Sequence, residues 1–178
     1  MAEISNFFDD IEEVKEIAEL LDYSPKEYNG AHYPGFAIAP EYIKKQVVAK
    51  LTEHHNCELF DVLCTFRKGT ERNTLIHTDI SAGTNTAIVY ISPETNTAFW
   101  KHLESGAFMV NTFEEDHLMY KSGDGNNPDL WELIRLGGSG VNTCSIYDTR
   151  NYHSIHPYEN MPNRLVCVTF YTLKGEEQ

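Results

Sequence analysis

Near its C-terminus the chain reads RLVCVTFYT, at residues 164–172. Alternate residues of a strand point to opposite faces, and here both faces are apolar. Val166, Val168 and Phe170 share one face, and Leu165, Cys167 and Tyr171 share the other. A strand without a polar face is buried on both sides. We therefore predict that one face lies in a core between two sheets and that the other faces the N-terminal helices.

Short strand-like segments precede this stretch along the chain. The first reads CELFDVLCTFR (residues 57–67) and ends at Lys68-Gly69. The others are residues 74–77, 86–91, 97–101, 107–110, 144–147 and 152–156. Turn-forming residues separate several of them, as in Ser92-Pro93-Glu94. One short helix, over residues 128–136, is predicted to interrupt the series.

Two amphipathic helices are predicted before the strands. Apolar residues from Phe8 to Leu21 follow helical spacing, with Asn6 as a candidate N-cap. A loop rich in turn formers follows over residues 23–35. Pro40 then suits the first turn of a second helix, whose apolar face is formed by Tyr42, Ile43, Val47 and Leu51. Two helices followed by about eight short strands predict an α+β chain, mostly β, with an antiparallel double sheet.

Length and charge exclude several classes of protein. A chain of 178 residues suits one domain. Its 14 basic and 27 acidic residues give a net charge of −13, which repels phosphate backbones and anionic membrane surfaces. No apolar run approaches the ~18–20 residues that a membrane span needs. The four cysteines show no C-x-x-C pairing and are interpreted as buried free thiols, which predicts a cytoplasmic protein.

The first candidate for chemistry is His77-Thr78-Asp79. Residues i and i+2 of a strand point to the same side, so this imidazole and carboxylate converge. With one more histidine they form a set of two histidines and one carboxylate, which leaves three positions open on a non-haem Fe(II). Taken alone the spacing is a weak signal, because a surface or turn role explains it equally well.

A second candidate is the cation that opens the apolar strand. Arg164 shares the face of Val166 and lies eleven residues after His153, which is itself in a strand-like run. A buried arginine is costly unless a carboxylate pairs with it, and its planar fork suits a bidentate carboxylate. The strand contains no acidic residue. Either another segment supplies the carboxylate or a ligand does.

Three segments together resemble a known family. They are IHTD (76–79), TAIVYISP (86–93) and YHSIHPYENMPNRLVCVTFY (152–171). This pattern resembles the double-stranded β-helix core of the Fe(II)/2-oxoglutarate-dependent oxygenases. The resemblance covers roughly residues 57–173, and the helices in residues 1–56 match the family's sheet-supporting helices. It implies a single oxygenase domain over residues 1–178, in which a jelly roll related to the cupins carries N-terminal helices behind its major sheet.

The resemblance also implies roles for individual residues. His77, Asp79 and His153 become the iron ligands, and Arg164 pairs with the C5 carboxylate of 2-oxoglutarate. Tyr90 matches a position that often hydrogen-bonds this cosubstrate. The segment TAFWKHLESG (97–106) is similar to one in small bacterial and phage members, which suggests a small or prolyl-hydroxylase-like member. One departure is Val166, where many members have a serine that assists the same carboxylate.

The function implied is a dioxygenase that uses Fe(II), 2-oxoglutarate and O2 to hydroxylate a small molecule or a peptide side chain. Residues 28–36 and 99–129 are predicted to wall the entrance, and nucleic acid is disfavoured as a substrate by the net charge. The main alternative is a cupin-like jelly-roll module that binds a metal or ligand without turnover. A metal-dependent isomerase or hydrolase on the same barrel is a third reading. A pure binding module gives no reason for a buried arginine near the metal.

Overall fold

The computed structural model describes residues 1–28, 31–69, 75–93, 95–156 and 164–176. Its helices are α1 (Ile11–Leu20), α2 (Glu41–His55) and α3 (Phe113–Ser122), with short 3-10 helices η1 (Asp124–Asn126) and η2 (Pro128–Leu130). The strands are β1 (Ala2–Ile4), β2 (Ser24–Tyr28), β3 (Ala31–Ile38), β4 (Leu59–Lys68), β5 (Asn85–Tyr90), β6 (Asn96–His102), β7 (Trp131–Gly137), β8 (Cys144–Asp148), β9 (His153–His156) and β10 (Leu165–Leu173).

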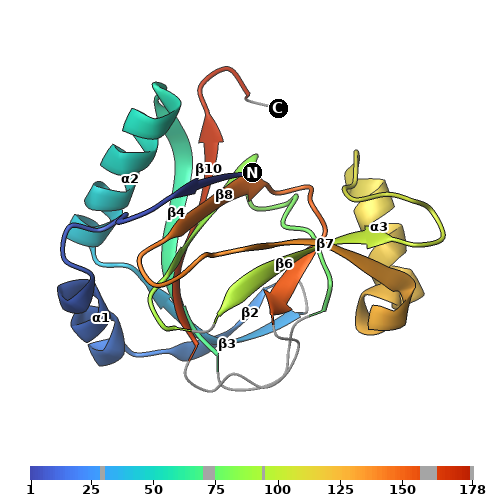
Figure 1. Cartoon of the computed structure of the whole chain (residues 1–178), viewed down its shortest axis with the longest axis horizontal. Coiled ribbons are helices and arrows are strands. Elements are labelled where there is room, and N and C mark those ends of the chain that lie inside the picture. The colour runs from blue at the N-terminus through green and yellow to red at the C-terminus, as the bar shows by residue number, and fades with distance from the viewer. Residues whose placement is uncertain (29–30, 70–74, 94, 157–163, 177–178) are drawn as a thin grey trace.

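The strands described form two antiparallel sheets. The larger has the order β1-β8-β5-β10-β4-β3-β2, and the smaller has the order β7-β6-β9. Helices α1 and α2 lie along one side of the large sheet, while the small sheet and α3 lie on the other side (Figure 1). The chain is therefore α+β and mostly β, as predicted. No helix among the described residues is long and apolar enough to cross a membrane.

The central strand β10 explains this layering. Its residues Leu165, Cys167 and Tyr171 join a core cluster with Val14 of α1 and Val47 of α2. Its other face, formed by Val166, Val168 and Phe170, joins a second cluster. This cluster also contains Ile88 and Tyr147 of the large sheet and Phe99 of the small sheet. The prediction that this strand is buried on both faces is confirmed.

The N-terminal helices begin where local capping favours them. The Asp10 side chain accepts a hydrogen bond from the Glu13 backbone N–H at 3.0 Å, so α1 begins at Ile11 rather than at the predicted Phe8. Asn6 is not the cap, because Phe7 and Phe8 are buried in the core before the helix starts. In α2 the predicted members Ile43, Val47 and Leu51 are buried, whereas Tyr42 is exposed and does not belong to the buried face.

Two predicted elements are wrong. Residues 128–136 do not form an α-helix: a single 3-10 turn leads into β7, which pairs along β6. A short apolar run fits a helix or a strand equally well. Here the strand is favoured because its backbone hydrogen-bonds to β6. The predicted loop over residues 23–35 instead contains the strands β2 and β3. Pro25 lies on the edge strand and Pro34 falls at a register shift, two places where a sheet tolerates proline.

Smaller differences concern single strands and the cysteines. His77 and Met109 form isolated bridges rather than the predicted strands at residues 74–77 and 107–110, and residue 74 lies outside the described part of the chain. Helix α3 was not predicted. The four cysteines are free thiols, three of them buried, as predicted. The cytoplasmic location stays a prediction.

Candidate metal centre

Backbone pairing brings the two predicted histidine ligands together. His77 lies between β4 and β5, and His153 begins β9. Their backbones form a reciprocal bridge, in which the His77 N–H donates to the His153 carbonyl at 3.0 Å and the His153 N–H donates back at 2.9 Å. The Asp79 N–H donates to the Thr149 carbonyl at 2.8 Å, which fixes the third ligand beside them.

The three side chains converge on one point. Asp79 Oδ2 lies 3.1 Å from His153 Nε2, and Asp79 Oδ1 lies 3.7 Å from His77 Nε2. One ligand atom from each residue can be chosen so that all lie within 4.8 Å of one another. Two atoms that each bind one ion at about 2.1 Å and at right angles are about 3 Å apart, so these spacings suit a divalent cation.

Hydrogen bonds hold both imidazoles in the tautomer that a metal requires. His77 Nδ1 lies 2.7 Å from the Leu75 carbonyl oxygen, and His153 Nδ1 lies 2.9 Å from the Asn151 carbonyl oxygen. A carbonyl can only accept, so each Nδ1 carries the hydrogen and each Nε2 keeps a lone pair. The same carbonyl bonds fix the ring orientation, as is usual for metal-bound histidines.

The electrostatics favour an anionic carboxylate beside a neutral imidazole. Burial opposes the ionisation of Asp79, but the facing His153, together with His77 and Arg67, holds the pKa of this carboxyl well below its usual range. Burial and the neighbouring His153 lower the pKa of His77, although Asp79 opposes this shift. At neutral pH the Asp79 carboxyl is therefore charged and the His77 imidazole is neutral, which is the state in which these two side chains bind a cation.

Arg164 lies on the inner face of the large sheet, where it was predicted. Its side chain is buried, and burial lowers its pKa to about 10, with repulsion from Arg67 adding to the shift. The guanidinium is therefore still charged at neutral pH. Within the described residues it forms no ion pair, and its Nε has no hydrogen-bond partner. A structural ion pair, the alternative explanation for Arg164, is not found in the part of the chain that the structure describes.

Arg67 adds a second cation to this face. It is paired across the ladder with Val166 of β10, and its guanidinium carbon lies 5.4 Å from the centre of the Phe170 ring. Its positive charge lowers the pKa values of Asp79, His77 and Arg164. The charge of Arg67 thus reaches the candidate ligands, whereas the charge of Arg164 reaches Tyr90 and Tyr147.

Tyr90 also faces the inner core and is fully buried. Its hydroxyl donates to Thr97 Oγ1 at 2.7 Å and so links the two sheets. Burial raises the pKa of Tyr90, and the charge of Arg164 opposes the shift, so the two side chains are close enough to interact. A contact with the cosubstrate stays a prediction for this residue.

The structure adds Tyr147, which sequence reasoning missed. This side chain is only 2% exposed, and its hydroxyl has no partner among the residues described. Its ring centre lies 5.1 Å from that of His153. Burial and the Asp79 carboxylate raise the pKa of Tyr147, while Arg67 and Arg164 oppose them. Tyr147 shares a face with Ser145 of the same strand, so strand alternation was the signal that could have found it.

Comparisons with known proteins agree on the fold. No protein-family model matches the chain, and no curated protein matches it in sequence. SnoN, a non-heme alpha ketoglutarate dependent epimerase from nogalamycin biosynthesis, is similar in structure with a TM-score of 0.51 and 14% identity over 96% of this chain and 76% of its own. HygX from Streptomyces hygroscopicus, crystallised with nickel, 2-oxoglutarate and hygromycin B, gives a TM-score of 0.54 and 12% identity over 95% and 81%. At these identities the likeness shows a shared fold.

Proposed function

We propose that this chain is a non-haem Fe(II)- and 2-oxoglutarate-dependent dioxygenase with a double-stranded β-helix core in one domain. His77, Asp79 and His153 hold the metal, and Arg164 binds the cosubstrate, with Tyr90 and Tyr147 beside it. A small or prolyl-hydroxylase-like member of the superfamily is the narrower form of this proposal. The substrate is a small molecule or a peptide side chain.

The observation that carries the proposal is a pair of buried polar atoms without described partners: one belongs to Tyr147, whose ring packs on His153, and the other to Arg164, whose charge acts on Tyr147. The Arg164 Nε and the Tyr147 hydroxyl are both donors, and neither meets an acceptor within the described residues. Leaving such groups unsatisfied costs free energy, and a buried charge costs more. The distal carboxylate of 2-oxoglutarate offers acceptors and a compensating charge to both. These residues therefore fit the cosubstrate.

The protein's own contribution is to prepare the site. The carbonyls of Leu75 and Asn151 hold the two imidazoles in the correct tautomer. Three protein ligands leave three positions of an octahedral ion for other molecules. Bound Fe(II) and 2-oxoglutarate would supply the oxidising chemistry with O2. Phe99 and Tyr147, whose rings pack edge to face at 4.9 Å, keep water away from His153.

Epimerisation is the second candidate outcome, because SnoN is an alpha ketoglutarate dependent epimerase on a similar fold. Both reactions require that a hydrogen be removed from a C–H bond. Hydroxylation adds one oxygen atom to the product, whereas epimerisation leaves the mass unchanged. Mass spectrometry of the product therefore distinguishes them, and we favour hydroxylation.

A binding module without turnover is the alternative from another class. It would keep the histidines and Asp79, but it gives no role to a buried, charged Arg164 without a described carboxylate partner. The two readings differ in one measurable property, which is whether 2-oxoglutarate binds to the metal-loaded protein.

Anaerobic titration with Fe(II) and 2-oxoglutarate tests the proposal. A weak visible charge-transfer band should appear only when both are present, because it requires the cosubstrate to chelate the metal. A band that fails to form with both present contradicts the proposed function. Loss of the band in Asp79→Asn, with folding retained, would assign it to the proposed centre.

Variants of Arg164 give a sharper test. Arg164→Leu should leave metal binding nearly intact and raise the 2-oxoglutarate concentration needed for half-saturation at least roughly tenfold, because a charge-assisted hydrogen bond is lost. Arg164→Lys should be intermediate, since lysine keeps the charge without the fork. Lys174→Leu is the matched control: it removes one positive charge from the exposed pair with Glu58 and should change neither property. Unchanged cosubstrate affinity in Arg164→Leu contradicts the assignment.

A further inference from the structure

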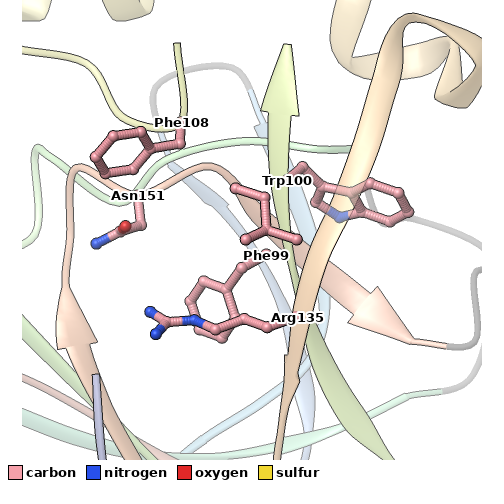
Figure 2. Close-up of a pocket in the computed structure, with 6 residues that line it drawn as sticks. Phe99, Trp100, Phe108, Arg135 and Asn151 are labelled. Atoms are coloured by element: carbon pink, nitrogen blue, oxygen red, sulfur yellow. The ribbon is translucent and has the colours of Figure 1, made fainter. Parts of the chain in front are cut away.

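A pocket of about 290 Å³ opens on the small sheet beside the candidate metal centre. Its walls are Phe99, Trp100, Phe108, Ile134, Arg135 and Asn151 (Figure 2). The lining is mostly aromatic and aliphatic, with one cation and one carboxamide. Pockets for small organic ligands usually run from about 300 to 1,000 Å³, so this one suits a compact molecule.

The pocket shares a wall with the metal centre. Arg135 of β7 is paired with Phe99 of β6, and Phe99 is paired with His153 of β9. Directly paired residues in neighbouring strands point to the same face, so the three side chains form one row across the small sheet. The Phe99 ring centre lies 6.4 Å from that of His153. Asn151 also belongs to both sites, because its carbonyl oxygen bonds His153 Nδ1 at 2.9 Å.

Aromatic rings from two separate buried clusters border this pocket. Phe99 packs with Tyr147 in the cluster between the two sheets, and Trp100 packs with Trp131 in another cluster. Phe108 adds a third ring from the segment before α3 and is 51% exposed, so it lies where a ligand can reach it.

Arg135 is the charged group of the pocket. Its guanidinium carbon lies 4.8 Å from the centre of the Phe99 ring, which holds the planar group against an aromatic face. In the part of the chain that the structure describes, Arg135 forms no ion pair, although the chain has 27 acidic residues. Figure 2 shows its guanidinium on the same side of the pocket as the carboxamide of Asn151.

We propose that the substrate of the proposed oxygenase is a small organic acid with a flat apolar body. Its carboxylate pairs with Arg135, and its body lies against Phe99, Trp100 and Phe108. A planar guanidinium matches a carboxylate in a bidentate arrangement, and stacking on Phe99 restrains it in advance. Arg135 is exposed, so its charge is not desolvated in the free protein; a neutral ligand of the same shape would lack the charge-assisted pairing that an acid gains.

This anion site is separate from the cosubstrate site. Arg135 belongs to the small sheet, and Arg164 precedes β10 of the large sheet. The proposal assigns Arg135 to the substrate and Arg164 to the cosubstrate, and the two residues can be altered independently. The inference rests on the proposed function, because only an enzyme has a substrate. Binding of the acid to the pocket does not itself require the metal.

Binding of phenylacetate and of its neutral analogue phenylacetamide tests the inference. Both are measured by ligand-observed NMR with the metal-free protein and with the protein loaded with Ni(II) and 2-oxoglutarate. The acid should bind roughly tenfold more tightly than the amide, the effect of one charge-assisted hydrogen bond. Arg135→Gln should remove this preference. Phe108→Ser, at an exposed position, should weaken both ligands alike.

Lys101→Gln is the matched control, because it removes one positive charge from an exposed pair with Glu132 on the same two strands. It should leave the acid preference intact. Equal affinities of acid and amide, no binding of phenylacetate, or a preference that persists in Arg135→Gln overturns the inference. If the acid preference is found but Fe(II) and 2-oxoglutarate give no charge-transfer band, the proposed function fails and the pocket assignment stands.

Discussion

Replacing Tyr147 by phenylalanine removes one oxygen atom and should change stability and cosubstrate binding in opposite directions. The hydroxyl is buried and has no partner within the described residues. A buried polar group without a hydrogen bond costs about 1–3 kcal/mol. Tyr147→Phe should therefore stabilise the ligand-free protein by about 1 kcal/mol or more, which raises the midpoint of thermal unfolding by about 2–4 °C per kcal/mol in a chain of this size.

The same change should weaken 2-oxoglutarate binding. If the hydroxyl donates to the carboxylate of the cosubstrate, its loss removes a hydrogen bond to a charged group, worth about 1.5–3 kcal/mol. The dissociation constant should rise at least roughly tenfold. Thermal unfolding of the metal-free protein and anaerobic titration of the Fe(II) form measure the two effects.

Tyr23→Phe is the control for both measurements. The Tyr23 hydroxyl donates to the Ala18 carbonyl at 2.7 Å on the helix side of the large sheet. Its loss should lower stability by about 0.5–1.5 kcal/mol and leave 2-oxoglutarate binding unchanged. A Tyr147→Phe variant that unfolds at a lower temperature than the parent, or that binds 2-oxoglutarate as tightly, would refute the reasoning about this hydroxyl.

Three further predictions follow from other parts of the structure. Asp79→Asn keeps the side-chain shape but removes the charge, so Ni(II) affinity measured by calorimetry should fall by more than about a hundredfold; a loss under tenfold would exclude Asp79 as a ligand. His55 Nε2 lies 2.8 Å from the Tyr171 hydroxyl, and burial lowers the pKa of His55. The stability that the neutral His55 imidazole contributes is therefore fully present above about pH 6.5 and is lost as the pH falls through the lower pKa of the folded state. The free energy of unfolding from denaturant titrations should therefore depend less on pH below 6.5 in His55→Asn than in the parent, and identical profiles would contradict this. At Gly125 an added Cβ would clash with the carbonyl oxygen of Ile76, next to His77, so Gly125→Ala should weaken Ni(II) binding, and unchanged affinity would contradict this.

The parts of the fold that could be predicted from sequence are those where apolar periodicity is unambiguous. RLVCVTFYT has two apolar faces, and only a strand packed between two layers buries both of them. Helix α3 is the opposite case, because it has no buried residue and hence no apolar stripe. A local signal was nevertheless present: Thr112 caps the helix by accepting from the Glu115 N–H at 3.2 Å, in the pattern of a capping box.

The candidate metal ligands were predicted because their residue types and the short His77-x-Asp79 spacing, followed by a later histidine, are visible in the sequence itself. Tyr147 was missed although strand alternation could have placed it on the inner face, and nothing in the neighbourhood of Arg135 is unusual as sequence. Tyr147 matters through an unsatisfied hydroxyl, and Arg135 through its place across the sheet from His153. Both properties depend on strand register, which packing between distant segments decides.

The reciprocal backbone bridge between His77 and His153 means that an ion bound by their side chains also acts as a cross-link. It joins the connection after β4 to the start of β9, two segments that meet only in the folded chain. Opening this corner requires release of the ion, so free metal at a hundredfold above its dissociation constant would oppose that opening by about 2.7 kcal/mol. Hydrogen–deuterium exchange of these two amides would then report how much of the site is occupied by metal.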